Sequence, residues 1–428
     1  MSIRISEILS NSPVSFDSAL NTFIPSEVIV SLIQDDCHEP LCIVKEGQAV
    51  AEGQVLATGS GIHSSVIHSP VPGVVSGFIS CSMPSGKRVP AVKIKLSGEF
   101  SLFGKPKQKS NWNSYPAASI RRLISDSGVI NTFSSPYPLA MQLDASTQLK
   151  NDVIVAVRLF DQDPSCVTDR FIANTYLEQV VEGAQVVATS INASAVVFFK
   201  PMDLNIEIPV DECKIKSFVL SVDTSKYPCG GQYDIIQASK KNSLGIRELN
   251  KTDLFLDSGT ALAVYEAAAY NQPVVDKLIH VSGNAIAGQG MFKVRIGTSF
   301  RALAAECGGF VKLPVKIIVN GLVCGLNVSD LDTPVTKYVK SVAFLTKKTF
   351  SYNIINDCIR CGHCRNLCPV GIKPDILFSL YKKHRVSDGS FVQSAALCNG
   401  CVLCNTGCPS RLPLAQVISL LKGSRNEK

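Results

Sequence analysis

The pattern of apolar and polar positions changes between successive segments of the 428-residue chain. After an N-terminal segment at 1–36, residues 37–100 form short apolar runs between glycine turns, which is typical of a small β-barrel. Residues 101–116 are polar and predict a linker. Residues 117–275 mix strand-like and helix-like runs, and this alternation predicts an α/β domain.

Four apolar runs of the predicted α/β domain have the length of strands, and two longer stretches between them have helical character. The strands are expected at 153–157, 195–199, 218–222 and 254–256. The helices are expected at 174–188 and 260–271.

The glycine turns of the first domain, at Gly47 and Gly53, are followed by the segment 66–77 (VIHSPVPGVVSG). This arrangement resembles the flattened β-barrel of lipoyl and biotinyl carriers. Those carriers hold their cofactor on a hairpin lysine, but no lysine occurs between Lys45 and Lys87. We therefore interpret the barrel as structural.

The last third of the chain contains a segment with a strand-like pattern and then one with a helical pattern. Residues 276–335 return to strand-like runs around one short helix at 300–306, which predicts a β-grasp module of the SLBB type. Residues 345–424 are helical and carry two cysteine-rich loops, which predicts a ferredoxin-like domain. The expected fold class is α/β multidomain, with an N-terminal lipoyl-like barrel-sandwich.

Composition agrees with a globular protein, because 46% of the residues are hydrophobic and 18% are charged. No run approaches the about 18 consecutive apolar residues of a membrane-spanning helix. The N-terminus also lacks the apolar core of a secretory signal. We expect a protein that stays in the cytoplasm or lies on the cytoplasmic face of a membrane, with no nucleic-acid partner.

Sixteen cysteines is a high count, and clustered cysteines in a cytosolic protein indicate metal rather than disulfides. Eight of them lie close together near the C-terminus. The other eight are scattered and are interpreted as small buried side chains. They are Cys37, Cys42, Cys81, Cys166, Cys213, Cys229, Cys307 and Cys324.

The clustered cysteines form two runs, 358–369 and 398–409, that both obey the pattern C-x₂-C-x₂-C-x₃-C-P. This spacing is typical of two-cluster ferredoxins, in which the fourth cysteine of each run binds the other [4Fe–4S] cluster. The first cluster is expected on Cys358, Cys361, Cys364 and Cys408. The second is expected on Cys398, Cys401, Cys404 and Cys368. Zinc is the alternative, but two complete runs of this kind would be unusual for it.

The cysteine-rich end is also the basic end of the chain. From Lys340 onward there are 13 Lys/Arg and 4 Asp/Glu, whereas the first 339 residues hold 29 and 31. A solvated face is one explanation. The other is a docking surface for an acidic partner such as a small electron carrier, because complementary charge speeds encounter.

Motifs of chemical catalysis are missing from the sequence. It contains no G-x-G-x-x-G after a strand, no Walker A, no H-E-x-x-H and no evident nucleophile–base pair. We therefore expect no catalytic residues and interpret the chain as a carrier of electrons, unless the α/β domain holds a flavin or nicotinamide site.

The order of these parts resembles the C subunit of the Rnf complex, a membrane-bound, ion-translocating ferredoxin:NAD⁺ oxidoreductase. The resemblance is strongest in the motifs 226–231 (KYPCGG), 259–267 (GTALAVYEA) and 333–337 (TPVTK). It implies a peripheral protein on the cytoplasmic side of the inner membrane. Its partners would be the membrane subunits and an acidic carrier, ferredoxin or flavodoxin.

In that family the α/β domain holds FMN and NADH on a glycine-rich loop followed by an acidic strand end. The matching stretches here are 127–138 (SGVINTFSSPYP) and 156–164 (AVRLFDQDP). Around Gly128 and Asn131 only one glycine is left, and bulky side chains prevent the close backbone approach that flavin and phosphate need. We expect FMN and NAD(H) binding to be weak or lost.

The main hypothesis is therefore an electron-transfer subunit of an Rnf-type complex that uses two [4Fe–4S] clusters. Two alternatives stay open. One is a cobalamin-reductase-like iron–sulfur flavoprotein, which shares the parts but needs its flavin. The other is an iron–sulfur scaffold whose clusters are only structural.

Overall fold

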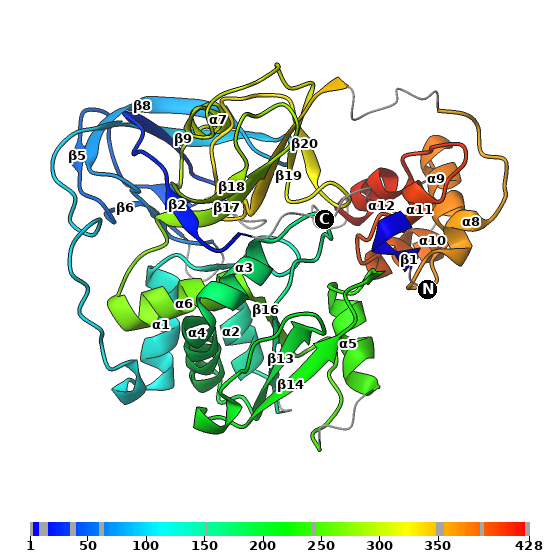
Figure 1. Ribbon diagram of the computed structural model, residues 1–428, viewed down its shortest axis with the longest axis horizontal. Coiled ribbons are helices and arrows are strands. Elements are labelled where there is room, and N and C mark those ends of the chain that lie inside the picture. Colours follow the sequence, from blue (N-terminus) through cyan, green and yellow to red (C-terminus); the bar gives the residue numbers. More distant parts are fainter. Residues whose placement is uncertain are drawn as a thin grey trace.

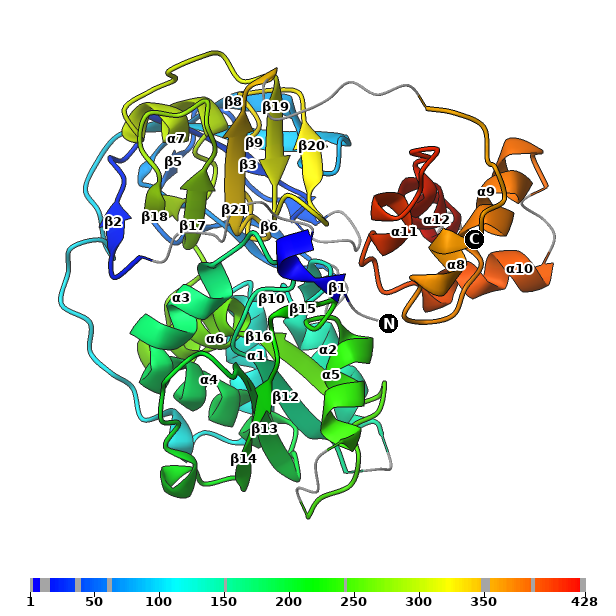
Figure 2. The ribbon, with the colours of Figure 1, turned by 45° about the vertical axis from the view of Figure 1, so that its right-hand side comes forward.

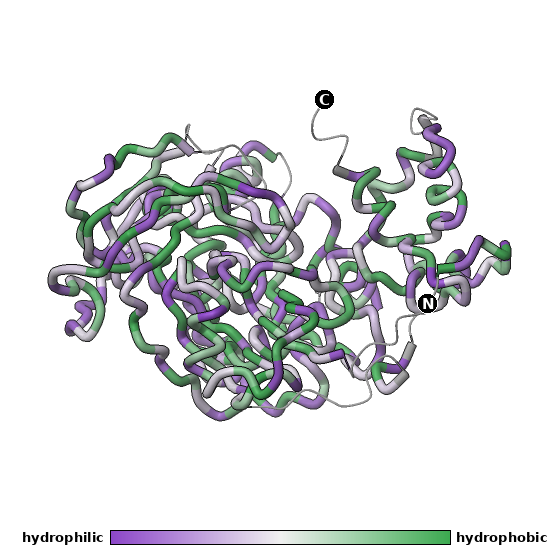
Figure 3. Tube along the Cα trace, turned by 90° about the horizontal axis from the view of Figure 1, so that it is seen from above, coloured by the Kyte–Doolittle hydropathy of each residue, from purple (hydrophilic) through white to green (hydrophobic). Residues whose placement is uncertain are grey.

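The computed structural model describes residues 3–7, 16–34, 40–59, 64–149, 152–241, 245–347, 355–385 and 389–423. In Figure 1 the N-terminal barrel and a six-stranded sheet lie together above the α/β domain, and the C-terminal helices stand at one side. Figure 2 places strand β1 (Ile3–Arg4) between the α/β domain and these helices. Seen from above in Figure 3, the C-terminal helices project from the rest of the molecule.

The N-terminal barrel consists of two sheets, ordered β3-β9-β8-β5 and β4-β6-β7. Its strands are β3 (Glu27–Ser31), β4 (Leu41–Cys42), β5 (Ala49–Val50), β6 (Val55–Thr58), β7 (Ile67–His68), β8 (Gly73–Ser82) and β9 (Arg88–Leu96). Val28 faces Ile94 across the β3–β9 pair, and both are fully buried. Because β3 belongs to this sheet, the barrel includes residues upstream of the expected boundary at residue 37.

The α/β domain is built on a parallel sheet ordered β14-β13-β12-β16. Its strands are β12 (Ile154–Arg158), β13 (Ala195–Pro201), β14 (Ser217–Val222) and β16 (Leu254–Asp257), which confirms the four predicted strands. Val155 and Phe198 face the core under most of the helices, whereas Ile154 and Phe199 face the helix on the other side. Burial on both faces explains why these strands are continuous apolar runs in the sequence.

Six helices cover the two faces of this sheet. They are α1 (Ala117–Asp126), α2 (Leu139–Thr147), α3 (Thr168–Thr175), α4 (Leu177–Ser190), α5 (Gln232–Lys240) and α6 (Ser258–Tyr270). Two short antiparallel strand pairs are also present. Strand β10 (Ile130–Asn131) pairs with β11 (Tyr137–Pro138), and β15 (Lys226–Tyr227) pairs with β1.

The helix predicted over 174–188 is confirmed as α4, which begins three residues later, at Leu177, because the preceding helix α3 ends in a break at Tyr176. Asn174 and Thr175 precede this break, and both residue types have low helix propensity. The helix predicted at 260–271 begins two residues earlier, at Ser258. There the carboxylate of Asp257 caps it by accepting a hydrogen bond from the backbone nitrogen of Thr260 at 2.6 Å.

A six-stranded sheet, ordered β2-β18-β17-β21-β19-β20, follows the α/β domain. Its strands are β2 (Ala19–Asn21), β17 (Asp276–Ser282), β18 (Gly290–Arg295), β19 (Lys316–Val319), β20 (Leu326–Val328) and β21 (Ser341–Leu345). Helix α7 (Phe300–Glu306) has the predicted bounds and is capped by Ser299. The sheet draws on residues outside the expected range 276–335, because β2 joins one edge and β21 lies near its middle.

The C-terminal part is helical, as predicted. Its helices are α8 (His363–Asn366), α9 (Pro374–Lys382), α10 (Gly389–Ser394), α11 (Leu403–Thr406) and α12 (Leu414–Gly423). Buried apolar side chains of α9 and α12, such as Leu377 and Ile418, form one small core together with cysteines of both loops. Short 3₁₀ turns lie at Ile5–Glu7, Trp112–Ser114, Val210–Glu212 and Ala395–Leu397. Within the described residues, no helix combines the length and the apolar character needed to cross a membrane.

Candidate metal centre

The two cysteine loops of the C-terminal part have the same backbone conformation. In each loop the residues two and four positions after the first cysteine have positive φ angles. These angles are 57° at Arg360 and 76° at Gly362, and 74° at Gly400 and 60° at Val402. The residue three positions after each fourth cysteine also matches, with 72° at Gly371 and 54° at Arg411. The repeated sequence pattern is thus a repeated three-dimensional structure.

Positive φ at Val402 is a costly conformation, because a β-branched side chain is strained in the left-handed region. Strain of this kind persists where the surrounding structure or a function requires it. Alternation of right- and left-handed residues turns successive backbone N–H groups toward one side, which creates a concave site for anions and sulfur clusters. In the second loop, the nitrogen of Gly400 donates to the sulfur of Cys398 at 3.4 Å.

The fourth cysteine of each run lies with the first three cysteines of the other run. Cys358, Cys361, Cys364 and Cys408 together line one small hollow. Burial raises the pKa of the Cys404 thiol to about 12, and the neighbouring thiols of Cys401, Cys398 and Cys368 contribute to the rise. Cys408 therefore lies beside the first three cysteines of the first run, and Cys368 lies beside those of the second; that these thiols bind two clusters stays a prediction.

The donor set consists of eight thiols in two runs whose spacing is typical of iron–sulfur proteins. Among the described residues, no group of three or more His, Cys, Asp or Glu side chains converges in a way that could hold one metal ion. Thiolates that hold a [4Fe–4S] cluster bind different irons and need not converge on one point, whereas four zinc ligands all lie about 2.3 Å from the same centre.

The two cysteine sets differ in exposure. Cys358 and Cys361 are exposed, and so are their neighbours Ile355 and Ile359, at 61% and 67%. Cys401 is buried and packs against Tyr227 and Leu403. The first site thus faces solvent, while the second faces the body of the protein.

Tyr227 connects the second cysteine loop to the other domains. Its hydroxyl donates a hydrogen bond to the backbone oxygen of Cys401 at 2.8 Å and lies 2.8 Å from the sulfur of Cys324. The carboxylate of Asp163 accepts hydrogen bonds from the backbone nitrogens of Val323 and Cys324, at 2.9 and 2.6 Å. These roles were not predicted, although Tyr227 and Asp163 both lie in segments that the family resemblance marks.

The scattered cysteines are mostly enclosed, as expected. Cys81 and Cys307 are buried, and Cys42, Cys166, Cys213, Cys229 and Cys324 are partly buried. Cys37 lies outside the described residues. Cys324 and Cys166 differ from the expectation in having a hydroxyl partner: Cys324 lies 2.8 Å from the hydroxyl of Tyr227, and Cys166 lies 3.1 Å from that of Ser341.

The two residues of the expected flavin loop make internal contacts. A Cβ added at Gly128, whose φ is +67°, would lie 2.2 Å from the backbone oxygen of Val66 and 2.6 Å from Nζ of Lys337. The side-chain amide of Asn131 donates to the backbone oxygen of Phe255 at 2.8 Å. The remaining glycine thus permits contact with the barrel, and Asn131 ties the loop to the parallel sheet.

In the second matching stretch, 156–164, side chains of the protein itself also fill the space. Arg158 is 1% exposed and stacks on the ring of Phe133, with 4.3 Å between the guanidinium carbon and the ring centre. Its Nε donates to the backbone oxygen of Phe160 at 2.8 Å. A Cβ added at Gly230 would lie 2.9 Å from the Cα of Gln162. The segments that match the family's flavin-binding segments are therefore packed directly against one another.

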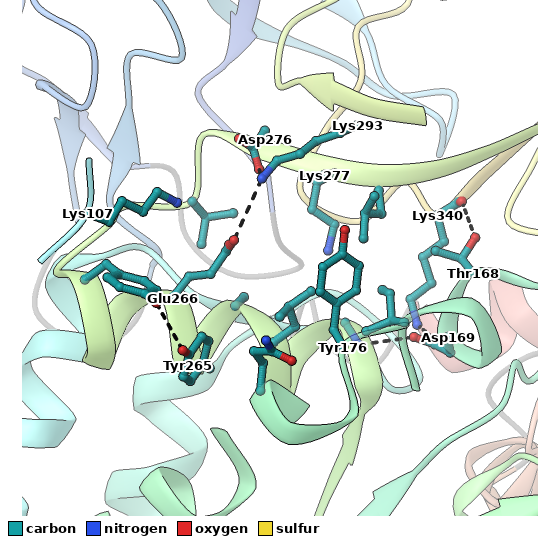
Figure 4. A pocket seen from close by; sticks show the side chains of 18 residues that line it. Lys107, Thr168, Asp169, Tyr176, Tyr265, Glu266, Asp276, Lys277, Lys293 and Lys340 are labelled. Atoms are coloured by element: carbon teal, nitrogen blue, oxygen red, sulfur yellow. Dashed lines mark hydrogen bonds and ion pairs between the residues drawn. The ribbon is translucent and has the colours of Figure 1, made fainter. Parts of the chain in front are cut away.

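A cavity of about 260 Å³ lies between α3, α6 and the strands β17 and β18, apart from the cysteine loops (Figure 4). Inside it, Nζ of Lys293 lies 3.3 Å from a carboxylate oxygen of Asp276 and 3.8 Å from one of Glu266. Lys277 also points into the cavity in Figure 4. Most of the charges in this cavity are paired within the chain and join the α/β domain to the six-stranded sheet.

The N-terminal fold is that of a barrel sandwich hybrid, because residues 14–99 match the family model of the RnfC Barrel sandwich hybrid domain. Longer matches come from curated proteins. The chain is 26% identical to the C subunit of the proton-translocating ferredoxin:NAD(+) oxidoreductase complex of Clostridium ljungdahlii, over 84% of this chain and 79% of that protein. It is 25% identical to the C subunit of the ion-translocating oxidoreductase complex of Rhodobacter capsulatus, over 94% and 79%.

A third relative is the C subunit of the Na(+)-translocating ferredoxin:NAD(+) oxidoreductase complex of Acetobacterium woodii, which is 25% identical over 78% of this chain and 76% of that protein. These matches confirm the resemblance to the C subunits of Rnf complexes that the sequence motifs indicate. They also confirm the expected barrel-sandwich at the N-terminus.

Proposed function

We propose that this chain is the electron-transfer subunit of a membrane-bound, ion-translocating oxidoreductase of the Rnf type. The observation that carries the proposal is the pair of equivalent cysteine loops, whose thiols divide into two crossed sets of four. The names of the relatives, all C subunits of ion-translocating complexes, agree with it. In this interpretation the C-terminal part is ferredoxin-like and the six-stranded sheet is a β-grasp module.

The eight cysteines would hold two [4Fe–4S] clusters, which supply one-electron transfer when bound. The loops contribute backbone N–H groups, of which that of Gly400 donates to the sulfur of Cys398, and the small core of α9 and α12 packs against cysteines of both loops. Because the two runs exchange their fourth cysteines, one folded unit fixes both clusters as neighbours.

The exposed side of the first site fits a docking surface for an acidic electron carrier. Cys358 and Cys361 are surrounded by the exposed apolar side chains of Ile355 and Ile359, and the exposed Arg360 lies in the same loop. An apolar surface with a basic residue next to a redox centre suits a partner whose own redox centre is surrounded by acidic groups. The membrane subunits would be the second class of partner, with the chain placed peripherally on the cytoplasmic side of the membrane.

We further propose that the α/β domain no longer binds FMN or NAD(H). Support comes from Arg158, which fills the space beside Phe133, and from Gly230, which lies against the backbone of Gln162. A flavin at this place would have to separate segments that pack directly on each other. The same argument counts against a cobalamin-reductase-like flavoprotein, because that function needs the flavin.

Anaerobic purification followed by iron, sulfide, zinc and flavin analysis tests this function directly. We expect about eight irons and about eight sulfides per chain, an EPR signal on reduction, and no stoichiometric FMN. Zinc in place of iron, or markedly fewer irons in a reconstituted sample, would refute the electron-transfer role. Stoichiometric FMN would refute the flavin part and leave the cluster part standing.

A further inference from the structure

Building on the proposed function, we propose that the hydroxyl of Tyr227, held in place by Cys324, is a positioning group that makes the second cluster electronically different from the first. The two cysteine loops are equivalent in sequence pattern and in backbone angles. A difference between them must therefore come from what surrounds each loop. Tyr227 belongs to the α/β domain and is 1% exposed.

The direction of the hydrogen bonds follows from the chemistry of the groups. The backbone oxygen of Cys401 can only accept, so the hydroxyl hydrogen of Tyr227 points to it over 2.8 Å. Since that hydrogen is used, the contact of 2.8 Å between the hydroxyl oxygen and Cys324 needs the thiol of Cys324 as donor. The chain of donors therefore runs from Cys324 through Tyr227 to the second cysteine loop.

Cys324 is itself held in place from the α/β domain. Its backbone nitrogen and that of Val323 donate to one carboxylate oxygen of Asp163, and the nitrogen of Leu322 donates to the hydroxyl of Ser165 at 2.7 Å. Asp163 is 4% exposed. This chain of hydrogen bonds, from Asp163 through Cys324 and Tyr227 to Cys401, thus joins residues that lie far apart in the sequence.

The corresponding position of the first loop has no such donor. Cys361 is exposed, and among the described residues no side chain donates a hydrogen bond to its backbone oxygen. Reduction of a cluster adds negative charge, and a donor that points at the ligand loop stabilises that charge. The hydrogen bond from Tyr227 should therefore make the midpoint potential of the second cluster less negative than it would be without this bond.

The test is a potentiometric titration monitored by EPR on the full chain, with Tyr227→Phe compared with the wild type. We expect the midpoint potential of the second cluster to become more negative while that of the first stays unchanged. Each titration is repeated in a Cys361→Ala background, where only the second ligand set is complete, so that the shifted signal can be assigned. Tyr233→Phe, an exposed tyrosine on α5, is the matched control and should shift neither potential.

Cys324 variants separate the electronic effect from general damage. Cys324→Ala should shift the second potential in the same direction by a smaller amount, and Cys324→Ser should restore it, because serine keeps a donor. Loss of the second cluster alone in Tyr227→Phe would also support the positioning role. Unchanged potentials, equal shifts of both clusters, or loss of both would overturn it. A wild type without iron would instead refute the proposed function.

Discussion

The ammonium nitrogen of Lys340 lies 2.6 Å from a carboxylate oxygen of Asp257, at the carboxyl end of the parallel sheet. The same nitrogen lies 2.7 Å from Asp169, which also faces Arg158 at 3.6 Å. Burial alone would raise the pKa of Asp257, but the attraction of Lys340 and Arg158 outweighs it and holds that pKa below its ordinary value. This network joins the chain just before β21 to the α/β domain.

Removal of Lys340 should therefore destabilise the protein strongly. Lys340→Ala leaves two buried carboxylates without their main partner, and we expect a loss of about 3–5 kcal/mol in the free energy of unfolding. Arg301→Ala is the control, because its ion pair with Asp332 is exposed and should contribute little to stability. Urea denaturation of both variants measures the difference, and equal losses would contradict the structural role of the network.

Gly128 should be required for contact between domains rather than for a cofactor. Gly128→Ala meets the backbone oxygen of Val66 at 2.2 Å and should cost about 1–3 kcal/mol of overpacking beyond the backbone strain. Gly104→Ala is a matched control, since Gly104 has a φ of +70° and open space around it, so only strain of about 1–2 kcal/mol applies. Equal destabilisation in urea denaturation would rule out the close contact.

Acid should lower the free energy of unfolding through the buried side chain of His68, within a defined pH window. Burial lowers the pKa of His68 to about 3, and repulsion from Lys337 adds to the effect. The unfolded chain, with a pKa of about 6.5, binds a proton that the folded protein excludes, so the stabilisation present above pH 6.5 is lost as the pH falls toward 3.

At about pH 5.5 this loss amounts to roughly 1 kcal/mol. Urea denaturation at about pH 7.5 and about pH 5.5 measures it, and His68→Asn should reduce the pH dependence by that amount. His384→Asn, at an exposed position, serves as the control and should leave it unchanged. An unaltered pH dependence in His68→Asn would show that this side chain does not titrate as expected.

Crossed ligation predicts which cysteine variants resemble one another. Cys368→Ser should lose the same cluster signal as Cys401→Ser, although Cys368 lies in the first run. Cys408→Ser should in turn resemble Cys361→Ser. Iron should fall from about eight to about four per chain in each case. Cys42→Ser is the control and should keep all of the iron; grouping of the variants by run instead of by crossed set would disprove the pairing.

Charge on the first loop should govern the encounter with an acidic carrier. Arg360→Asn removes one positive charge, and asparagine tolerates the positive φ found at this position. We expect a several-fold slower reaction with a small acidic ferredoxin at about 10 mM ionic strength and little difference at about 1 M, where the Debye length falls to about 3 Å. Arg122→Asn, on the exposed side of α1, should have no effect, and a salt-independent defect would exclude electrostatic docking.

Local patterns predicted those parts of the fold that depend on neighbours in the chain. The strands around Val155 and Phe198 were found because burial on both faces produces continuous apolar runs. Helix α7 has the predicted bounds, and its start is a local feature, because the side chain of Ser299 accepts a hydrogen bond from the backbone nitrogen of Ala302. The addition of β3 to the barrel was not found, because pairing with the distant strand β9 decides it. The break at Tyr176 was not found either, although Asn174 and Thr175 just before it have low helix propensity.

The sequence alone predicted the ligand set of the candidate site, because the spacing of cysteines within one run restricts which thiols can reach the same cluster. It also marked 127–138 and 156–164, which differ from the family's glycine-rich loop and acidic strand end. Only the tertiary structure decided that the two equivalent loops have different surroundings. Tyr227 and Cys401 are 174 residues apart, and their hydrogen bond exists only because the folded domains bring them together.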